Sequence, residues 1–156
     1  MSFSGIADRI VINSTGLESC VEFDLGSEIG RVNCYMLLAK SHDPYCVTNK
    51  IDVYVEDSKA ISLKIGDRIE LKLSIVFGNG HSKVAFGSKE NFVQPKVQSS
   101  HTKFTASIQK IIDEYTLICS VGKLGKDILA EFEEPIKDLM ENETIEFNGE
   151  IKAELI

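Results

Sequence analysis

The sequence lacks any run of about eighteen apolar residues, the length that a membrane-spanning helix needs. It begins without a basic stretch followed by a long apolar run and shows no lipidation motif, so we expect no signal peptide and no membrane attachment. Cysteine is scarce and widely spaced, which argues against a disulfide framework. We therefore expect a cytoplasmic protein whose thiols are small buried hydrophobes, namely Cys20, Cys34, Cys46 and Cys119.

Motifs that mark catalytic and metal sites are also missing. A structural zinc site needs four ligands, usually in closely spaced pairs, and the chain has no C-x-x-C or H-x-x-x-H. His42, Asp43 and Cys46 form one short cluster of ligand types, which we interpret as a turn that leads into a strand. No G-x-S-x-G and no P-loop occurs. We expect no enzyme, no metal and no cofactor, although an active site assembled only in space stays open.

Basic residues are outnumbered by acidic ones, 17 against 24, which gives a net charge of −7. The imbalance lies mostly in residues 96–156, which carry seven basic and twelve acidic side chains. An acidic protein is poorly suited to neutralising phosphates, so non-specific nucleic-acid binding is disfavoured. The C-terminal part is predicted to present an acidic face to a basic protein partner, with Glu141, Glu143 and Glu146 as candidate binding residues.

What is abundant is an alternation of apolar and polar residues with period two, the pattern of β-strands. Turn signals separate these segments about every 8–12 residues, which indicates a sandwich or a barrel. The predicted strands are Arg9–Ile12, Cys20–Leu25, Val32–Ala39, Ile51–Glu56, Arg68–Phe77, Ser82–Phe86, Lys103–Ile112, Tyr115–Val121, Asp127–Phe132 and Glu143–Leu155.

Two local patterns predict connections. Gly78-Asn79-Gly80 supplies the positive φ of a tight reversal, so Arg68–Phe77 and Ser82–Phe86 are predicted to form a hairpin. Pro135, followed by apolar residues at helical spacing, predicts one short helix near residues 135–140.

Two further patterns concern the chain's division and its last strand. Residues Gln94–Thr102 are polar, contain a proline and lack an apolar repeat. We therefore predict a β-rich domain over residues 1–94, a linker over 95–102 and a smaller acidic β-rich domain over 103–156. The Asn148-Gly149 pair predicts a hairpin turn or a bulge within the last strand.

The two predicted domains share a weak internal sequence repeat. Phe3–Val11 resembles Phe104–Ile112 when one gap is allowed, and Ile61–Leu71 resembles Ile136–Phe147. This sequence pattern resembles that of small Greek-key barrels of the OB type, which often begin with an F-x-G-x-I-like strand. The resemblance implies an all-β fold of two small OB-like barrels. A single sandwich or barrel with a β-rich extension is the alternative.

Basic and aromatic residues interleave after the predicted hairpin, at Lys83, Phe86, Lys89, Phe92 and Lys96. Single-stranded nucleic acid is bound by aromatic platforms in a positive groove, so these residues form a candidate nucleic-acid site. The simpler interpretation is that both phenylalanines pack in the core beside solvated lysines.

These observations favour a non-enzymatic module that recognises another protein through its acidic C-terminal part. The alternatives are single-stranded nucleic-acid binding near residues 83–96 and an immunity-type inhibitor of a basic toxin. A homodimer is also left open, because long strands such as Arg68–Phe77 need a partner on each side.

Overall fold

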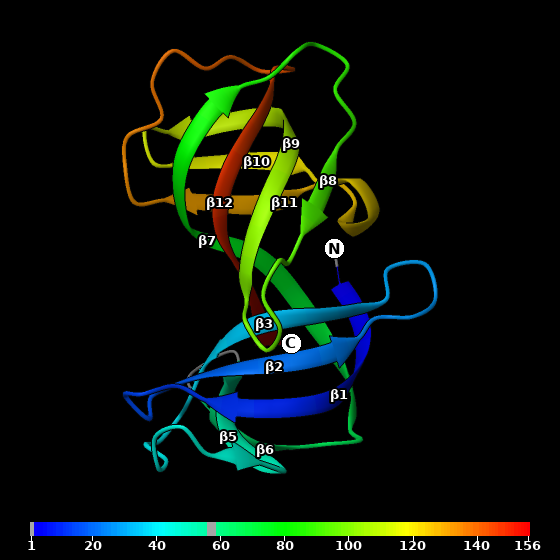
Figure 1. The fold of residues 1–156 in the computed structure, drawn as a ribbon, viewed down its shortest axis with the longest axis vertical. Helices are drawn as coiled ribbons and strands as arrows, with labels where there is room; N and C mark the ends of the chain where they lie inside the picture. Colours follow the sequence, from blue (N-terminus) through cyan, green and yellow to red (C-terminus); the bar gives the residue numbers. More distant parts are fainter. Residues whose placement is uncertain (1, 56–58) are drawn as a thin grey trace. The chain divides into compact units, whose positions relative to one another are not determined.

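The protein is described by a computed structural model that covers residues 2–55 and 59–156 (Figure 1). Its one helix within these residues is the 3₁₀ turn η2, Gly122–Leu124, and no described helix is long and apolar enough to cross a membrane. The predicted all-β fold is therefore confirmed. The strands are β1 Ser2–Ile12, β2 Glu18–Asp24, β3 Arg31–Leu37, β4 Val47–Thr48, β5 Lys50–Val55, β6 Lys59–Lys64, β7 Arg68–Lys83, β8 Asn91–Val93, β9 His101–Asp113, β10 Thr116–Ser120, β11 Ile128–Phe132 and β12 Thr144–Leu155.

Most predicted strands coincide with observed ones, and β5 and β12 show two local differences. The predicted strand Ile51–Glu56 corresponds to β5, and Glu56 lies outside the described residues. Asn148-Gly149 forms neither the predicted hairpin turn nor a bulge, because β12 continues through it with an unbroken register against β9. The missing side chain of Gly149 permits a close approach instead, since a Cβ there would lie 3.0 Å from the Val76 carbonyl oxygen.

The predicted hairpin at Gly78-Asn79-Gly80 is wrong, because β7 continues through these residues. Gly78 lies against the ring of Phe132, where a Cβ would come within 2.7 Å of a ring carbon. Phe77 and Gly80 adopt φ values of 57° and 63° inside the strand. The glycines therefore serve a close contact and a bend in one long strand, two uses that a sequence pattern cannot distinguish from a turn.

The predicted helix near residues 135–140 is also wrong, because this segment is a loop. The Ile136 N–H donates to the Glu114 carbonyl oxygen at 2.7 Å, and Asp138 has a φ of 59°. The Met140 N–H donates to the Glu143 carboxylate. A helix of one or two turns is unfavourable alone, and here the backbone donors find partners outside it.

Two compact units make up the chain, and each draws on distant parts of the sequence. The described part of unit 1 comprises Ser74–Lys96 and His101–Ile151, and unit 2 comprises Ser2–Leu73, Val97–Ser100 and Lys152–Ile156. Strands β7 and β12 therefore each contribute one part to unit 1 and another to unit 2. The sequence-based boundaries at residues 1–94, 95–102 and 103–156 stay a prediction beside these interleaved units.

Unit 2 is built on four strand pairings, to which the chain between β3 and β7 adds others. Strands β1, β2 and β3 pair antiparallel in sequence order, and β1 pairs antiparallel with the first part of β7, with Phe3 opposite Leu71. The end of β12 runs parallel to β3, with Lys152 opposite Tyr35. The chain between β3 and β7 adds β4 and the antiparallel pair β5–β6, and β12 also pairs with β5.

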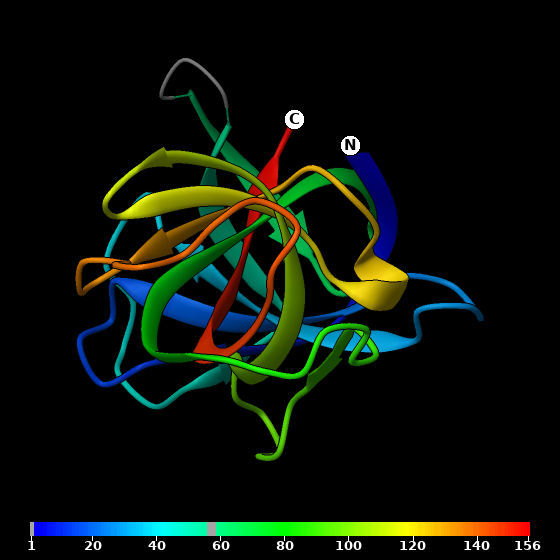
Figure 2. The ribbon, with the colours of Figure 1, turned by 90° about the horizontal axis from the view of Figure 1, so that it is seen from above.

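Unit 1 repeats the same order of strand pairings. Figure 2 shows its strands in colours that run from green for β7 to red for β12. Strands β9, β10 and β11 pair antiparallel in order, β9 pairs antiparallel with β12, and β11 runs parallel to the second part of β7. Phe104 lies opposite Phe147. This pair is equivalent to Phe3 and Leu71 in unit 2, as the internal sequence repeat predicts. Strand β8 pairs with the first part of β9, whereas the additional strand beside β1 in unit 2, β4, pairs with the end of β1.

The cysteines follow the prediction only in part. Cys34 and Cys119 are buried, Cys20 is half-buried and none of the four forms a disulfide. Burial, together with the charge of Glu90, raises the pKa of Cys119 to about 12. Cys46 is exposed, so its predicted burial is wrong.

Candidate functional site

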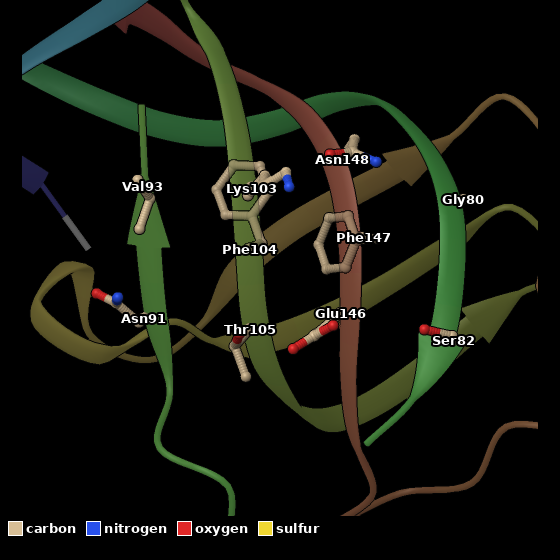
Figure 3. Close-up of a pocket in the computed structure, with 10 residues that line it drawn as sticks. All are labelled: Gly80, Ser82, Asn91, Val93, Lys103, Phe104, Thr105, Glu146, Phe147 and Asn148. Carbon is tan, nitrogen blue, oxygen red and sulfur yellow. The ribbon is translucent and has the colours of Figure 1, made fainter. Parts of the chain in front are cut away.

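A groove of about 380 Å³ crosses four strands of unit 1 (Figure 3). Its lining residues come from β7, β8, β9 and β12, and all of them belong to this unit. The volume lies at the lower end of the range for small-ligand sites, about 300–1,000 Å³. The groove is therefore the candidate binding site of unit 1.

Strand register arranges the groove residues in two outward-facing rows. Residues directly opposite in paired strands share a face, and residues two apart on one strand return to that face. We name the rows after their one charged side chain. The acidic row is Asn91, Thr105 and Glu146, and the basic row is Val93, Lys103 and Asn148.

Between the two rows lies an inward-facing row of phenylalanines. Phe92 is opposite Phe104, which is opposite Phe147. The rings of Phe104 and Phe147 stack with centroids 5.1 Å apart, and Phe132 packs on Phe147 at 4.8 Å. Phe104 and Phe147 are buried. The floor of the groove thus rests on a packed aromatic core, which fixes the positions of the outer rows.

The two rows offer opposite charges on neighbouring strands. Within the described chain, no ion pair of 4.0 Å or less joins Lys103 to Glu146. The amides of Asn91 and Asn148 each provide hydrogen-bond donors and an acceptor. The arrangement can therefore receive a ligand that carries both charges and its own hydrogen-bonding groups.

Strand β7 forms one wall of the groove with small residues, Gly80 and Ser82. A Cβ on Gly80 would lie 3.4 Å from the Asn148 amide nitrogen. The Gly80 N–H donates to Glu134 Oε1 at 2.7 Å, and His81 Nδ1 lies 3.4 Å from the same oxygen. The Glu134 carboxylate thus holds this bent part of β7 to the loop after β11.

The opposite wall, β8, is held in place by Glu90. Its carboxylate accepts hydrogen bonds from Ser120 Oγ at 2.6 Å and from the Gly122 N–H at 3.0 Å. Burial favours a higher pKa for Glu90, but these hydrogen bonds, with help from Ser107 and the charge of Lys126, outweigh it and lower the pKa. The ionised carboxylate therefore joins the entry of β8 to β10 and η2.

The structure separates the three predicted acidic residues. Glu146 lies in the groove, and Glu141 is exposed in the loop before β12. Glu143 Oε2 lies 3.2 Å from Lys83 Nζ, and its other oxygen accepts the Met140 N–H. Glu143 therefore has a structural role in the loop, and the partner-binding roles of all three stay predictions.

The five predicted nucleic-acid residues are separated as well. Lys83 is paired with an acid, as described above, while Lys89 and Lys96 are exposed. Phe92 is half-buried and faces the core. Phe86 is 92% exposed, so its interpretation as a core residue is wrong. Their nucleic-acid roles stay predictions.

Sequence reasoning missed most of the groove, above all Lys103, Asn91 and Asn148. Alternation within each strand does place these side chains on the outer face. Which strands lie side by side is fixed by pairings between distant segments, and no local signal carries that information. Only Glu146 was singled out, and that was on charge alone.

Ligand types for a metal do not gather in the part of the chain that the structure describes. No group of three or more His, Cys, Asp or Glu side chains there is placed to hold an ion. The segment His42–Cys46 forms a turn before β4, in which the His42 N–H donates to the Gly16 carbonyl at 2.9 Å.

Comparison with known proteins adds no relative to this geometry. No family model, curated protein or solved structure matches the chain.

Proposed function

We propose that this protein is a non-enzymatic binding module that recognises another protein, and that the groove of unit 1 is its binding site. The observation that carries the proposal is the pair of outer rows. They present Lys103 and Glu146 over a packed floor without pairing these charges to each other. A polypeptide segment is a ligand that supplies both signs of charge and main-chain hydrogen bonds together.

The repeated strand order supports the further proposal that each unit is OB-like. In both units, three antiparallel strands are followed by a strand that pairs with the first, and a parallel strand completes the set. OB-type barrels serve widely as binding scaffolds, which is consistent with a module whose specificity lies in its walls and loops. The four cysteines form no disulfide, which supports the cytoplasmic location that we propose with it.

A selection experiment tests the protein-binding proposal. Peptides are enriched from a displayed random library on the full chain, and their affinities are measured by fluorescence anisotropy. Lys103→Glu and Glu146→Lys should each weaken the enriched peptides about tenfold, which is roughly 1.4 kcal/mol.

Glu70→Lys is the matched control, because Glu70 lies opposite Ser4 in unit 2 as Glu146 lies opposite Thr105 in unit 1. It makes the same change of charge at the equivalent exposed position and should leave the affinity unchanged. Equal losses in Glu70→Lys and Glu146→Lys would show a bulk charge effect and contradict the proposal.

Single-stranded nucleic-acid binding is the second candidate, favoured by one observation. Phe86 is almost fully exposed on the loop before β8, where it is free to stack on a base. Labelled single-stranded DNA and RNA are titrated with the protein at low and physiological salt. Binding that weakens with salt and is lost in Phe86→Ala would favour this candidate. We expect no binding at either salt.

A further inference from the structure

Unit 2 contains an exposed sheet edge that the groove of unit 1 does not involve. Strand β6 lies at the end of the strand order and has β5 as its single neighbour among the described strands. Leu63 is buried, whereas Lys59, Ala60, Ile61, Ser62 and Lys64 are exposed. An edge of this kind presents unpaired backbone groups that another strand can meet.

Hydrogen bonds show which backbone groups of β6 face outward. The Ile65 N–H donates to Asn49 across the β5 side at 2.9 Å, so residues 61, 63 and 65 direct their backbone toward β5. By alternation, residues 60, 62 and 64 point to the free edge. Asp67 already occupies the last of these, because it accepts the Lys64 N–H at 2.9 Å and its own N–H donates to the Lys64 carbonyl at 3.1 Å. Ala60 and Ser62 remain as the accessible pairing positions.

The charged side chains of β6 itself are all basic. Lys59 and Lys64 stand at the two ends of β6, and Lys50 on β5 lies directly opposite Lys64. Like charges placed directly opposite repel. Within the described chain none of the three ammonium groups has an ion pair, and the nearby Asp52 is paired with Lys40 at 2.8 Å. An acidic strand beside β6 would relieve this repulsion.

An apolar position lies between the lysines. Ile61 shares the inward face with the buried Val53 and Leu63, yet 44% of its surface is exposed. An apolar side chain opposite Ile61 on an added strand would cover it.

We propose that β6 binds an extended acidic segment of a partner protein by strand addition. The segment pairs with Ala60 and Ser62, covers Ile61 with an apolar side chain and sets acidic side chains opposite Lys59 and Lys64. This occupant is favoured over a second copy of the chain, because two copies would bring two sets of these lysines together.

Two synthetic hexapeptides test the proposal on the full chain. In one, glutamates flank alternating threonine and valine, and in its twin lysines replace the glutamates. In a ¹H–¹⁵N NMR titration the acidic peptide should shift the amide signals of Ala60 and Ser62. The basic twin should bind about tenfold more weakly, since two surface ion pairs become repulsive.

Variants locate the binding. The double change Lys59→Glu and Lys64→Glu should reverse the preference between the peptides. Ser62→Pro removes an edge N–H at a position where a sheet edge tolerates proline, and it should abolish binding. Lys103→Glu, in the groove of unit 1, should have no effect.

Three results would overturn the proposal. The first is equal binding of both peptides, and the second is loss of binding in Lys103→Glu but not in the β6 variants. The third is a dimer of the protein alone, seen by sedimentation velocity, that Ser62→Pro dissociates, because the edge would then take a second copy.

Discussion

Units 1 and 2 share four strand pairings and differ in what is added to them. The outward-facing pair Thr105 and Glu146 of unit 1 has its equivalent in Ser4 and Glu70 of unit 2. Unit 1 adds β8 and the last residues of β7 as walls, and a groove results. Unit 2 instead adds β4, β5 and β6, and an open edge results. In both units, the added segments complete the candidate site: in unit 1 they form the walls of a groove whose other residues lie on the repeated strands β9 and β12.

The largest expected effect tests whether the repeated strands form equivalent cores. Phe147→Ala should lower the free energy of unfolding by about 3–5 kcal/mol, and Leu71→Ala, its equivalent in unit 2, by about 2–5 kcal/mol. Urea unfolding followed by circular dichroism measures both. A loss below about 1 kcal/mol in either variant would break the proposed equivalence of the two cores.

The next prediction tests whether each unit depends on the part of β7 or β12 that belongs to it. Ile75 on β7 is buried in unit 1 and Leu155 on β12 is buried in unit 2. Ile75→Ala and Leu155→Ala should each cost about 2–4 kcal/mol, although each residue belongs to a strand that also serves the other unit. The same urea experiment serves here. A Leu155→Ala variant as stable as the unmodified protein would mean that unit 2 does not depend on β12.

A smaller effect concerns the close contact of β7 in unit 1. Gly78→Ala forces a Cβ against the Phe132 ring and should destabilise the protein by about 1–3 kcal/mol. Adding Phe132→Leu to this variant should recover part of the loss by removing the ring. Thermal unfolding of the single and double variants provides the measurement. An unchanged melting temperature in Gly78→Ala would show that β7 does not pass Phe132 this closely.

The smallest effect is a pH dependence confined to unit 1. The pKa of Glu90 is lower in the folded protein than its ordinary value of 4.5, because hydrogen bonds to its carboxylate outweigh its burial. Between the folded and the unfolded pKa, the Glu90 carboxyl group is therefore protonated more often in the unfolded chain than in the folded protein. The stability from Glu90 is present above its unfolded pKa and is lost as the pH falls through the folded pKa. Urea midpoints at several acidic pH values should fall less steeply in Glu90→Gln than in the unmodified protein, and parallel curves would contradict this.

The sequence predicted individual strands well and their arrangement poorly. The alternation of apolar and polar residues located β9 and β12, because it depends only on which side chains of a single strand face the core and which face solvent. It could not show that β7 runs on past Gly78, since that depends on Phe132, more than fifty residues away. The loop at residues 135–140 had helical spacing, but its backbone found partners such as Glu114.

The candidate site was predictable only in fragments. The charge count led to Glu146 but equally to Glu143, which is used to hold a loop through Lys83. Lys103 and Asn148 form a site only because β9 and β12 pair in one register. Nothing local in either segment encodes that register.

An NMR titration of the full chain with a library-selected peptide locates the binding site residue by residue, because each backbone amide gives its own signal. We expect the amide signals of Lys103, Thr105, Glu146 and Asn148 to shift and those of Ser4, Glu70 and Lys72 to stay unchanged. Shifts centred on the unit 2 positions, or spread evenly over both units, would contradict the claim that the walls of unit 1 create the binding site.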